Sequence, residues 1–178
     1  DCEYIVLASG LWSRQIGVQV GVRVPIYPAE HFYIITEPIE NLSKTLPVVR
    51  DFDNRTYIKE DAGKILVGIF EGNSIPAWNK TNKVPEDFSF GEFQENFEHF
   101  EPYLASAIKR FPILETAGIR KFFSGPESFT PDTNPLLGEV PEIKNFFVCC
   151  GLNSIVIGSG GGVGKVTAEW LMTGHINE

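Results

Sequence analysis

A glycine-rich stretch near the end of the 178-residue chain constrains the fold more than any other feature. The stretch covers residues 151–165, follows an apolar run over 145–150, and leads into a helical pattern from Val163 to Met172 that Gly174 ends. This order predicts a strand, a glycine loop and a helix. Glycines let a backbone come close to a ligand, and the first turn of a helix offers unpaired N–H groups to negative charge. The stretch therefore predicts an anion or cofactor cradle.

The spacing of these glycines excludes two common phosphate-binding motifs. The dinucleotide fingerprint G-x-G-x-x-G fails because Val163 or Lys165 stands at the position of its last glycine. The phosphate loop G-x-x-x-x-G-K-[ST] fails because Ser159 replaces its first glycine and Val166 its hydroxyl residue. A flexible loop between two buried elements explains the stretch as well as a cradle does. Other parts of the chain must decide between these two interpretations.

Composition and charge limit the partners of the chain. Its net charge is -8 and it has no basic run to neutralise phosphates, which argues against a nucleic-acid or anionic-membrane partner. No apolar run approaches membrane-spanning length, so we expect no membrane span. Cys2, Cys149 and Cys150 lack metal-ligand spacing, so we expect no metal site and a reducing compartment. Because the chain opens on Asp1 and leads straight into a strand, we expect a fragment of a longer protein.

Short elements alternate along the first half of the chain. A strand at 4–8 and a brief helix at 11–16, which Gly17 ends, repeat the order of strand, glycine and helix. Further strands are predicted by runs of aromatic and β-branched residues, with a hairpin turn at 60–63. These runs lie at 31–36, 48–50, 56–59 and 64–70. Together they indicate an antiparallel sheet.

The second half of the chain begins with an amphipathic helix. A capping box at 89–92 predicts its start, apolar residues recur at helical spacing from Phe93 to Phe111, and Pro102 predicts a kink or two abutting helices. A return strand is expected at 119–123, whereas residues 125–132 are too irregular for a helix or a strand.

Four stretches of the chain, in this order, resemble one family of flavoproteins. They are Leu7–Trp12, Glu30–Tyr33 with Thr36–Pro38, Gly125–Asp132 with Leu136–Glu139, and Cys150–Lys165. The family includes sarcosine dehydrogenase, dimethylglycine dehydrogenase and the regulatory subunit of pyruvate dehydrogenase phosphatase. The run Gly-Pro-Glu-Ser-Phe-Thr-Pro-Asp is the most specific of the four, and together they span nearly the whole chain.

The resemblance implies a fold of the α/β (α+β) class. Residues 1–25 and 125–178 are expected to form part of an incomplete FAD-binding Rossmann-like domain, and residues 26–124 an inserted antiparallel-sheet substrate domain with amphipathic helices. In the family the first βαβ unit lies upstream of such a segment. Many members also carry a folate-binding domain downstream, so tetrahydrofolate is expected only through a domain that this chain lacks.

The resemblance also implies that FAD is the cofactor. The helix that starts near Gly160 is expected to aim its positive end at the pyrimidine edge of the flavin, where reduction places negative charge. The expected cofactor-binding residues are Gly10, Trp12, Gly151, Leu152, Asn153, Ser154, Gly160, Gly161, Gly162, Val163, Gly164 and Lys165.

Two residues align with the amine site of dimethylglycine-oxidising relatives. By this resemblance His31 accepts a proton from the amine or hydrogen-bonds to it, and Tyr57 positions the carboxylate of the substrate. Without the family resemblance, His31 is better interpreted as a strand histidine whose hydrogen bonds are made within the protein, and Tyr57 as an aromatic residue packed on the sheet.

Two departures from the related sarcosine oxidases bear on the reaction. Leu66 stands where those enzymes carry a lysine that activates oxygen, which favours a dehydrogenase. Gly158 stands where they carry a lysine that holds the substrate carboxylate. Carboxylate recognition must then come from another part of the protein, or the substrate is different.

The resemblance implies a dehydrogenase that oxidises sarcosine or dimethylglycine by hydride transfer to FAD. Its expected partners are a small N-methylated amino acid and an electron-acceptor flavoprotein, in the mitochondrial matrix of a eukaryote or the cytoplasm of a bacterium. One alternative is a non-catalytic flavoprotein similar to the phosphatase regulatory subunit. The other is an α/β domain without cofactor, which requires the glycine stretch and the run Thr130-Pro131-Asp132 to be coincidence.

Overall fold

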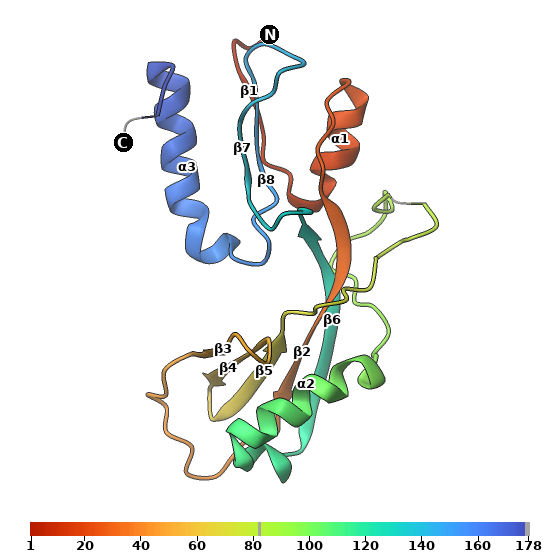
Figure 1. Ribbon diagram of the computed structural model, residues 1–178, viewed down its shortest axis with the longest axis vertical. Coiled ribbons are helices and arrows are strands. Elements are labelled where there is room, and N and C mark those ends of the chain that lie inside the picture. Colours follow the sequence, from red (N-terminus) through yellow and green to blue (C-terminus); the bar gives the residue numbers. More distant parts are fainter. Residues whose placement is uncertain (82, 177–178) are drawn as a thin grey trace. The chain divides into compact units, whose positions relative to one another are not determined.

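A computed structural model describes residues 1–81 and 83–176 of the chain, which form two compact units (Figure 1). The first unit comprises Asp1–Ala29, Pro76–Phe88 and Glu127–Glu178. The second unit comprises Glu30–Ile75 and Ser89–Pro126. Both combine strands with helices, which confirms the predicted α/β class.

The first unit is built on a three-stranded sheet with the order β1-β8-β7. Strand β1 (Ile5–Leu7) lies parallel to β8 (Phe146–Cys150), and β8 lies antiparallel to β7 (Leu136–Glu139). The chain leaves β1 through η1 (Gly10–Trp12) and α1 (Ser13–Gln19), and leaves β8 through a short loop into α3 (Val156–Thr173). The carboxyl ends of two parallel strands therefore meet at one edge of this sheet, where α/β proteins commonly bind ligands.

Helix α1 does not end at Gly17 as the sequence pattern predicts. It continues to Gln19, and Gly21 adopts the left-handed conformation, with φ of 81°, just beyond the helix. Gly17 lies inside the helix because the returning chain packs against it: a Cβ at Gly17 would lie 2.9 Å from the carbonyl oxygen of Val22. Gly17 therefore allows close packing of the returning chain and does not end the helix.

Residues 76–88 pack with the first unit, although the sequence places them within the segment 26–124. The N–H of Ala77 donates to the carbonyl of Pro28 at 3.0 Å, and the N–H of Val84 donates to Oε1 of Gln15 at 3.0 Å. The side chains of Ala77 and Val84 are buried. These contacts join positions far apart in the chain, so no local pattern reveals them.

The larger sheet has the order β3-β4-β5-β2-β6. Its strands are β3 (Val49–Asp51), β4 (Thr56–Asp61), β5 (Lys64–Ile69), β2 (Tyr27–Thr36) and β6 (Ile119–Phe129). The unit boundaries fall within β2 and β6. Pairs β3·β4, β4·β5 and β5·β2 are antiparallel, and the predicted hairpin turn is confirmed, because Ala62 and Gly63 both have positive φ between β4 and β5.

The prediction that residues 125–132 form no regular element is wrong for the first half of that run. Strand β6 continues through Gly125 and Pro126 to Phe129. It is an edge strand of the sheet, so one side of its backbone has no neighbouring strand among the described residues, and Pro126 is tolerated there.

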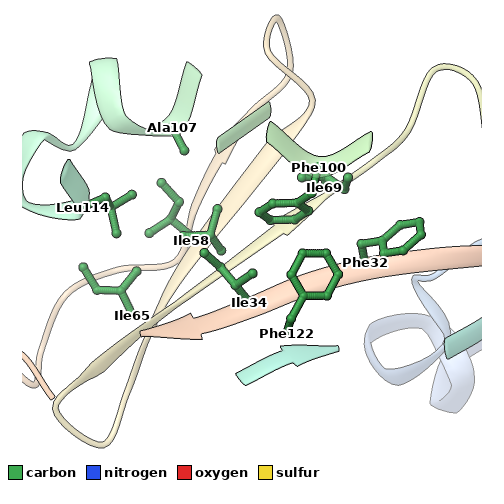
Figure 2. Packing of buried hydrophobic residues seen from close by; sticks show 10 residues of the cluster. Phe32, Ile34, Ile58, Ile65, Ile69, Phe100, Ala107, Leu114 and Phe122 are labelled. Carbon is green, nitrogen blue, oxygen red and sulfur yellow. The ribbon is translucent and has the colours of Figure 1, made fainter. Parts of the chain in front are cut away.

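The core of the second unit lies between the sheet and helix α2 (Phe97–Arg110), with η2 (Pro112–Glu115) beside it. Figure 2 shows how alternate residues of the strands, such as Phe32 and Ile34 of β2, meet Phe100 of α2 and Phe122 of β6. Phe32 and Phe100 are completely buried. Because side chains alternate along a strand, this core uses one face of the sheet and leaves residues such as His31 and Tyr33 on the other.

The predicted capping box at 89–92 does not start α2. The helix begins at Phe97, and the side chain of Asn96 caps it by accepting the N–H of His99 at 3.0 Å. The preceding segment runs beside β6, where the N–H of Phe93 donates to the carbonyl of Ser124 at 2.7 Å, and this tertiary contact prevents an earlier start. Pro102 lies inside α2, which remains one helix.

Candidate cofactor and amine sites

A cavity of about 230 Å³ lies in the first unit, at the carboxyl ends of β1 and β8. Five residues expected from the sequence to bind the cofactor line it: Gly10, Trp12, Gly151, Leu152 and Ser154. Complete small-molecule sites typically measure about 300–1,000 Å³, so this cavity suits one part of a larger ligand. Larger hollows in the same unit, of about 340 and 280 Å³, contain none of the expected residues.

The loop that borders this cavity is held in shape by Asn153. The backbones of Gly151, Asn153 and Ser154 all have left-handed φ values, of 66°, 49° and 66°. Oδ1 of Asn153 accepts the N–H of Thr130 at 2.8 Å, and Nδ2 of Asn153 donates to the carbonyl of Gly151 at 2.6 Å. The side chain of Asn153 therefore binds the protein rather than pointing at a ligand, and its role in the site is to position the loop.

Replacing Asn153 with alanine is expected to lower the free energy of unfolding by about 1–3 kcal/mol, because the N–H of Thr130 loses its acceptor. Alanine also adopts the left-handed conformation less readily than asparagine. Urea denaturation of the complete protein measures the effect. Asn54→Ala is the control, because among the described residues that exposed side chain bonds only to Asp51, in a surface turn. Equal denaturation midpoints for Asn153→Ala and the wild type would contradict the assignment.

Ser154 supplies an unsatisfied polar group at this cavity. Its Oγ is buried and has no hydrogen-bond partner among the described residues. Val156, the first residue of the 18-residue helix α3, lines the same cavity, so the positive end of the helix lies there. A buried hydroxyl and a helix N-terminus suit a ligand with a polar edge that gains negative charge. The residues present therefore fit the pyrimidine edge of a flavin.

The glycines from 158 to 164 lie inside a helix, not in a loop as the sequence predicts. Helix α3 starts at Val156, four residues before the expected start near Gly160. It contains Gly158, Gly160, Gly161, Gly162 and Gly164, and each glycine in a helix interior costs about 1 kcal/mol relative to alanine. A Cβ at any of these five positions would have no atom of another described segment within 4 Å. Packing within the described chain thus does not explain them, whereas close approach of a ligand would.

The remaining expected cofactor residues lie farther along α3 and do not line the cavity. They are Gly160, Gly161, Gly162, Val163, Gly164 and Lys165. The ammonium of Lys165 lies 3.7 Å from Oε1 of Glu169, in an exposed pair one helical turn away. The side chain of Lys165 is 76% exposed, as expected of a solvated helix lysine.

A second cluster, in the second unit, surrounds the two residues expected to contact the amine. The rings of His31 and Tyr57 lie 5.8 and 5.4 Å from the ring of Phe70, measured between centroids. Tyr57 also lies directly opposite Gly68, where a Cβ would overlap the phenol ring. Gly68 thus makes room for Tyr57, and the sheet brings His31 and Tyr57 together around Phe70.

His31 is held by a buried carboxylate that the sequence interpretation missed. Oε2 of Glu71 lies 3.1 Å from Nδ1 of His31, and Oε1 of Glu71 accepts the N–H of Phe32 at 3.2 Å. The side chains of Glu71 and His31 are 1% and 14% exposed. Because a carboxylate accepts, Nδ1 of His31 carries a proton, so in the neutral form of the ring the lone pair lies on Nε2. Glu71 follows β5 and is 40 residues from His31, so only the pairing of β2 with β5 could have indicated it.

The cysteines beside the cavity differ from Cys2 in accessibility. Burial raises the pKa of the Cys150 thiol to about 11, whereas Cys2 is exposed. Since the thiolate is the reactive form, iodoacetamide at pH 8 is expected to modify Cys2 and to spare Cys150, and Cys150 becomes reactive only as the pH approaches 11. Peptide mass spectrometry measures both sites, with unfolded protein as the control in which both react. Equal rates in the folded protein would contradict the burial of Cys150.

The described parts of the chain contain neither a cluster of metal ligands nor a helix that could span a membrane. Over 1–81 and 83–176, no three histidine, cysteine or acidic side chains gather as metal ligands would. None of the helices described is long and apolar enough to cross a bilayer.

Comparison with known proteins identifies the relatives of this chain. A family model described as FAD dependent oxidoreductase matches residues 1–170. The 4-methylaminobutanoate oxidase (formaldehyde-forming) of Paenarthrobacter nicotinovorans is 42% identical over 97% of this chain and 21% of its own length. Human mitochondrial sarcosine dehydrogenase is 40% identical over 96% of this chain and 18% of its own length. The mitochondrial pyruvate dehydrogenase phosphatase regulatory subunit of Mus musculus is 37% identical over 100% of this chain and 20% of its own length. The chain thus spans about a fifth of the length of these relatives.

Solved structures share the fold. L-proline dehydrogenase from P. horikoshii superposes with a TM-score of 0.77 at 23% identity, over 98% of this chain and 44% of that structure. Glycine oxidase from Geobacillus kaustophilus superposes with a TM-score of 0.72 at 26% identity, over 96% of this chain and 42% of that structure.

Proposed function

The chain belongs to the family of FAD-dependent oxidoreductases, and from this premise we propose that it is part of a dehydrogenase for an N-methylated amino acid, sarcosine or dimethylglycine. The observation that carries the proposal is the His31–Glu71 pair beside Tyr57 and Phe70. This pair provides an oriented proton acceptor on the second unit, while the first unit provides a cavity suited to the flavin.

Several groups of the first unit would hold the cofactor. The Ser154 hydroxyl and the N–H groups at the start of α3 would bind the polar edge of the ring, and the glycine-rich turns of α3 would allow close approach. The chemistry supplied by bound FAD is acceptance of a hydride from the substrate carbon next to the amine nitrogen. The oxidised substrate is an iminium, which water converts to formaldehyde and the demethylated amine.

His31 prepares the amine for this reaction. Hydride leaves the carbon only when the neighbouring nitrogen has a lone pair, so a substrate that arrives as an ammonium must lose a proton. Glu71 fixes the proton of His31 on Nδ1, and Nε2 then serves as the acceptor for the ammonium proton. Glu71 acts through His31 and is a positioning residue, and Tyr57 is proposed to orient the substrate beside the same ring.

The route of the electrons and the cellular setting complete the proposal. Leu66, which replaces the oxygen-activating lysine of related sarcosine oxidases, favours transfer of electrons to an electron-acceptor flavoprotein. We place the protein in the mitochondrial matrix if it is eukaryotic and in the cytoplasm if it is bacterial.

A second candidate is a regulatory flavoprotein without amine chemistry. Similarity to the phosphatase regulatory subunit of Mus musculus favours this candidate, because that protein matches the full length of this chain at 37% identity. Such a protein would bind FAD in the first unit and leave the His31 cluster without a substrate.

Anaerobic titration of the complete natural protein separates the two candidates. The flavin absorption band is expected to disappear on addition of sarcosine or dimethylglycine, and 4-methylaminobutanoate is added as a third amine because of the relative that is named for it. A flavin band that persists with all three amines would refute the proposed dehydrogenase and favour the regulatory candidate. A purified protein without any flavin band would refute the assignment of the cavity.

A further inference from the structure

We propose that the carboxylate of Glu127 lowers the reduction potential of the bound flavin. This proposal deepens the proposed function, because it names a residue that tunes the redox step. It rests on the assignment of the cavity of about 230 Å³ in the first unit to the flavin, and it holds for any amine that the protein oxidises.

Glu127 lies near the end of β6 and belongs to the wall of this cavity. Oε1 of Glu127 accepts the N–H of Ser128 at 2.9 Å, and Ser128 lines the same cavity. Ser128 is buried and Glu127 is half-buried. The hydrogen bond therefore holds the carboxylate beside the cavity.

The charge of Glu127 is not compensated in the cavity wall. Among the described residues that line the cavity, no other side chain is acidic or basic apart from two cysteines, Cys149 and Cys150. Burial raises the pKa of the Cys150 thiol to about 11, so this thiol is neutral at pH 7. Over residues 1–81 and 83–176, Glu127 forms no ion pair, and the N–H that it accepts is uncharged.

Groups in this cavity act on the charge of the flavin in opposite directions. The hydroxyl of Ser154 and the start of α3 stabilise negative charge. The carboxylate of Glu127 opposes it, because like charges repel. Taken as a sphere, the cavity is about 8 Å across, and at this range one unit charge near a protein surface changes an equilibrium constant about tenfold or more.

The charge of the flavin changes when the amine is oxidised. A hydride carries two electrons and one proton, so the flavin gains one negative charge while the neutral amine becomes an iminium. Glu127 makes this gain less favourable. It also makes the later loss of the same two electrons to the acceptor more favourable. The residue thus favours onward transfer of electrons over their retention on the flavin.

The midpoint potential of the complete, FAD-containing protein tests the proposal without any substrate. It is measured by anaerobic equilibration with a reference redox dye. Glu127→Gln removes the charge and keeps an oxygen for the N–H of Ser128. We expect it to raise the equilibrium constant for two-electron reduction about tenfold, which corresponds to a potential about 30 mV more positive. Glu127→Asp keeps the charge and should restore most of the wild-type potential.

Glu142→Gln is the matched control, because it removes a negative charge from an exposed residue of the same unit that does not line this cavity. An unchanged or lower potential in Glu127→Gln would overturn the proposal. Equal shifts in Glu127→Gln and Glu142→Gln, or in Glu127→Gln and Glu127→Asp, would overturn it too. If the potential shifts as expected but no amine bleaches the flavin, the proposed dehydrogenase fails and the role of Glu127 stands. Bleaching by an amine with an unshifted potential gives the reverse.

Discussion

Replacing Glu71 with glutamine is expected to lower kcat for the amine substrate by about 10- to 100-fold in the complete protein, with little change in folding. Oε1 of the glutamine can still accept the N–H of Phe32, so its NH2 group must face Nδ1 of His31. An amide NH2 donates, and Nδ1 must then accept, which moves the ring proton of His31 to Nε2. His31 can no longer take a proton from the amine, and positioned general bases typically contribute about 10²–10⁴-fold.

The rate of flavin reduction under anaerobic stopped-flow conditions measures this effect. Glu37→Gln is the control, since Glu37 is an exposed carboxylate of the same unit, 3.7 Å from Arg120. A double-mutant cycle with His31→Gln tests the mechanism, because the effect of Glu71→Gln should disappear when His31 is absent. A loss of equal size in both backgrounds would show that Glu71 acts independently of His31.

Replacing Gly160, Gly161 and Gly162 together with alanine is expected to abolish FAD binding while stabilising helix α3. Each substitution should favour the helix by about 1 kcal/mol, and the three methyl groups meet no atom of another described segment within 4 Å. A ligand that contacts this backbone closely would be displaced, since each intruding methyl group costs about 1–3 kcal/mol. The Kd for FAD should therefore rise by at least about 100-fold.

Two measurements on the same variant check this result. Fluorescence titration of the apoprotein with FAD gives the affinity, and thermal unfolding of the apoprotein gives the stability. Ala168→Leu is the control, because it enlarges an exposed side chain in the second half of the same helix. Unchanged FAD affinity in the triple variant would show that the glycines do not face the cofactor, and a destabilised apoprotein would show that they serve packing instead.

Local sequence determined the elements and the broad identity of the site. Runs of aromatic and β-branched residues predicted β2, β4 and β5, and the sequence at 60–63 predicted the hairpin turn that the positive φ values of Ala62 and Gly63 confirm. The family resemblance indicated FAD, which the family match confirms, and it singled out His31 and Tyr57. These features are readable because strand periodicity, turn conformation and motifs depend on residues that are close together in the chain.

Tertiary structure decided the features that depend on distant partners. Helix α2 starts at Phe97 rather than at the capping box, because the preceding backbone bonds to β6. Helix α3 includes the glycines despite their poor helix propensity, whereas the sequence pattern predicted a loop for this stretch. The pairing of Glu71 with His31 follows from the alignment of β5 with β2. Strand register brings together residues that no short-range pattern connects, so these contacts became visible only in the folded chain.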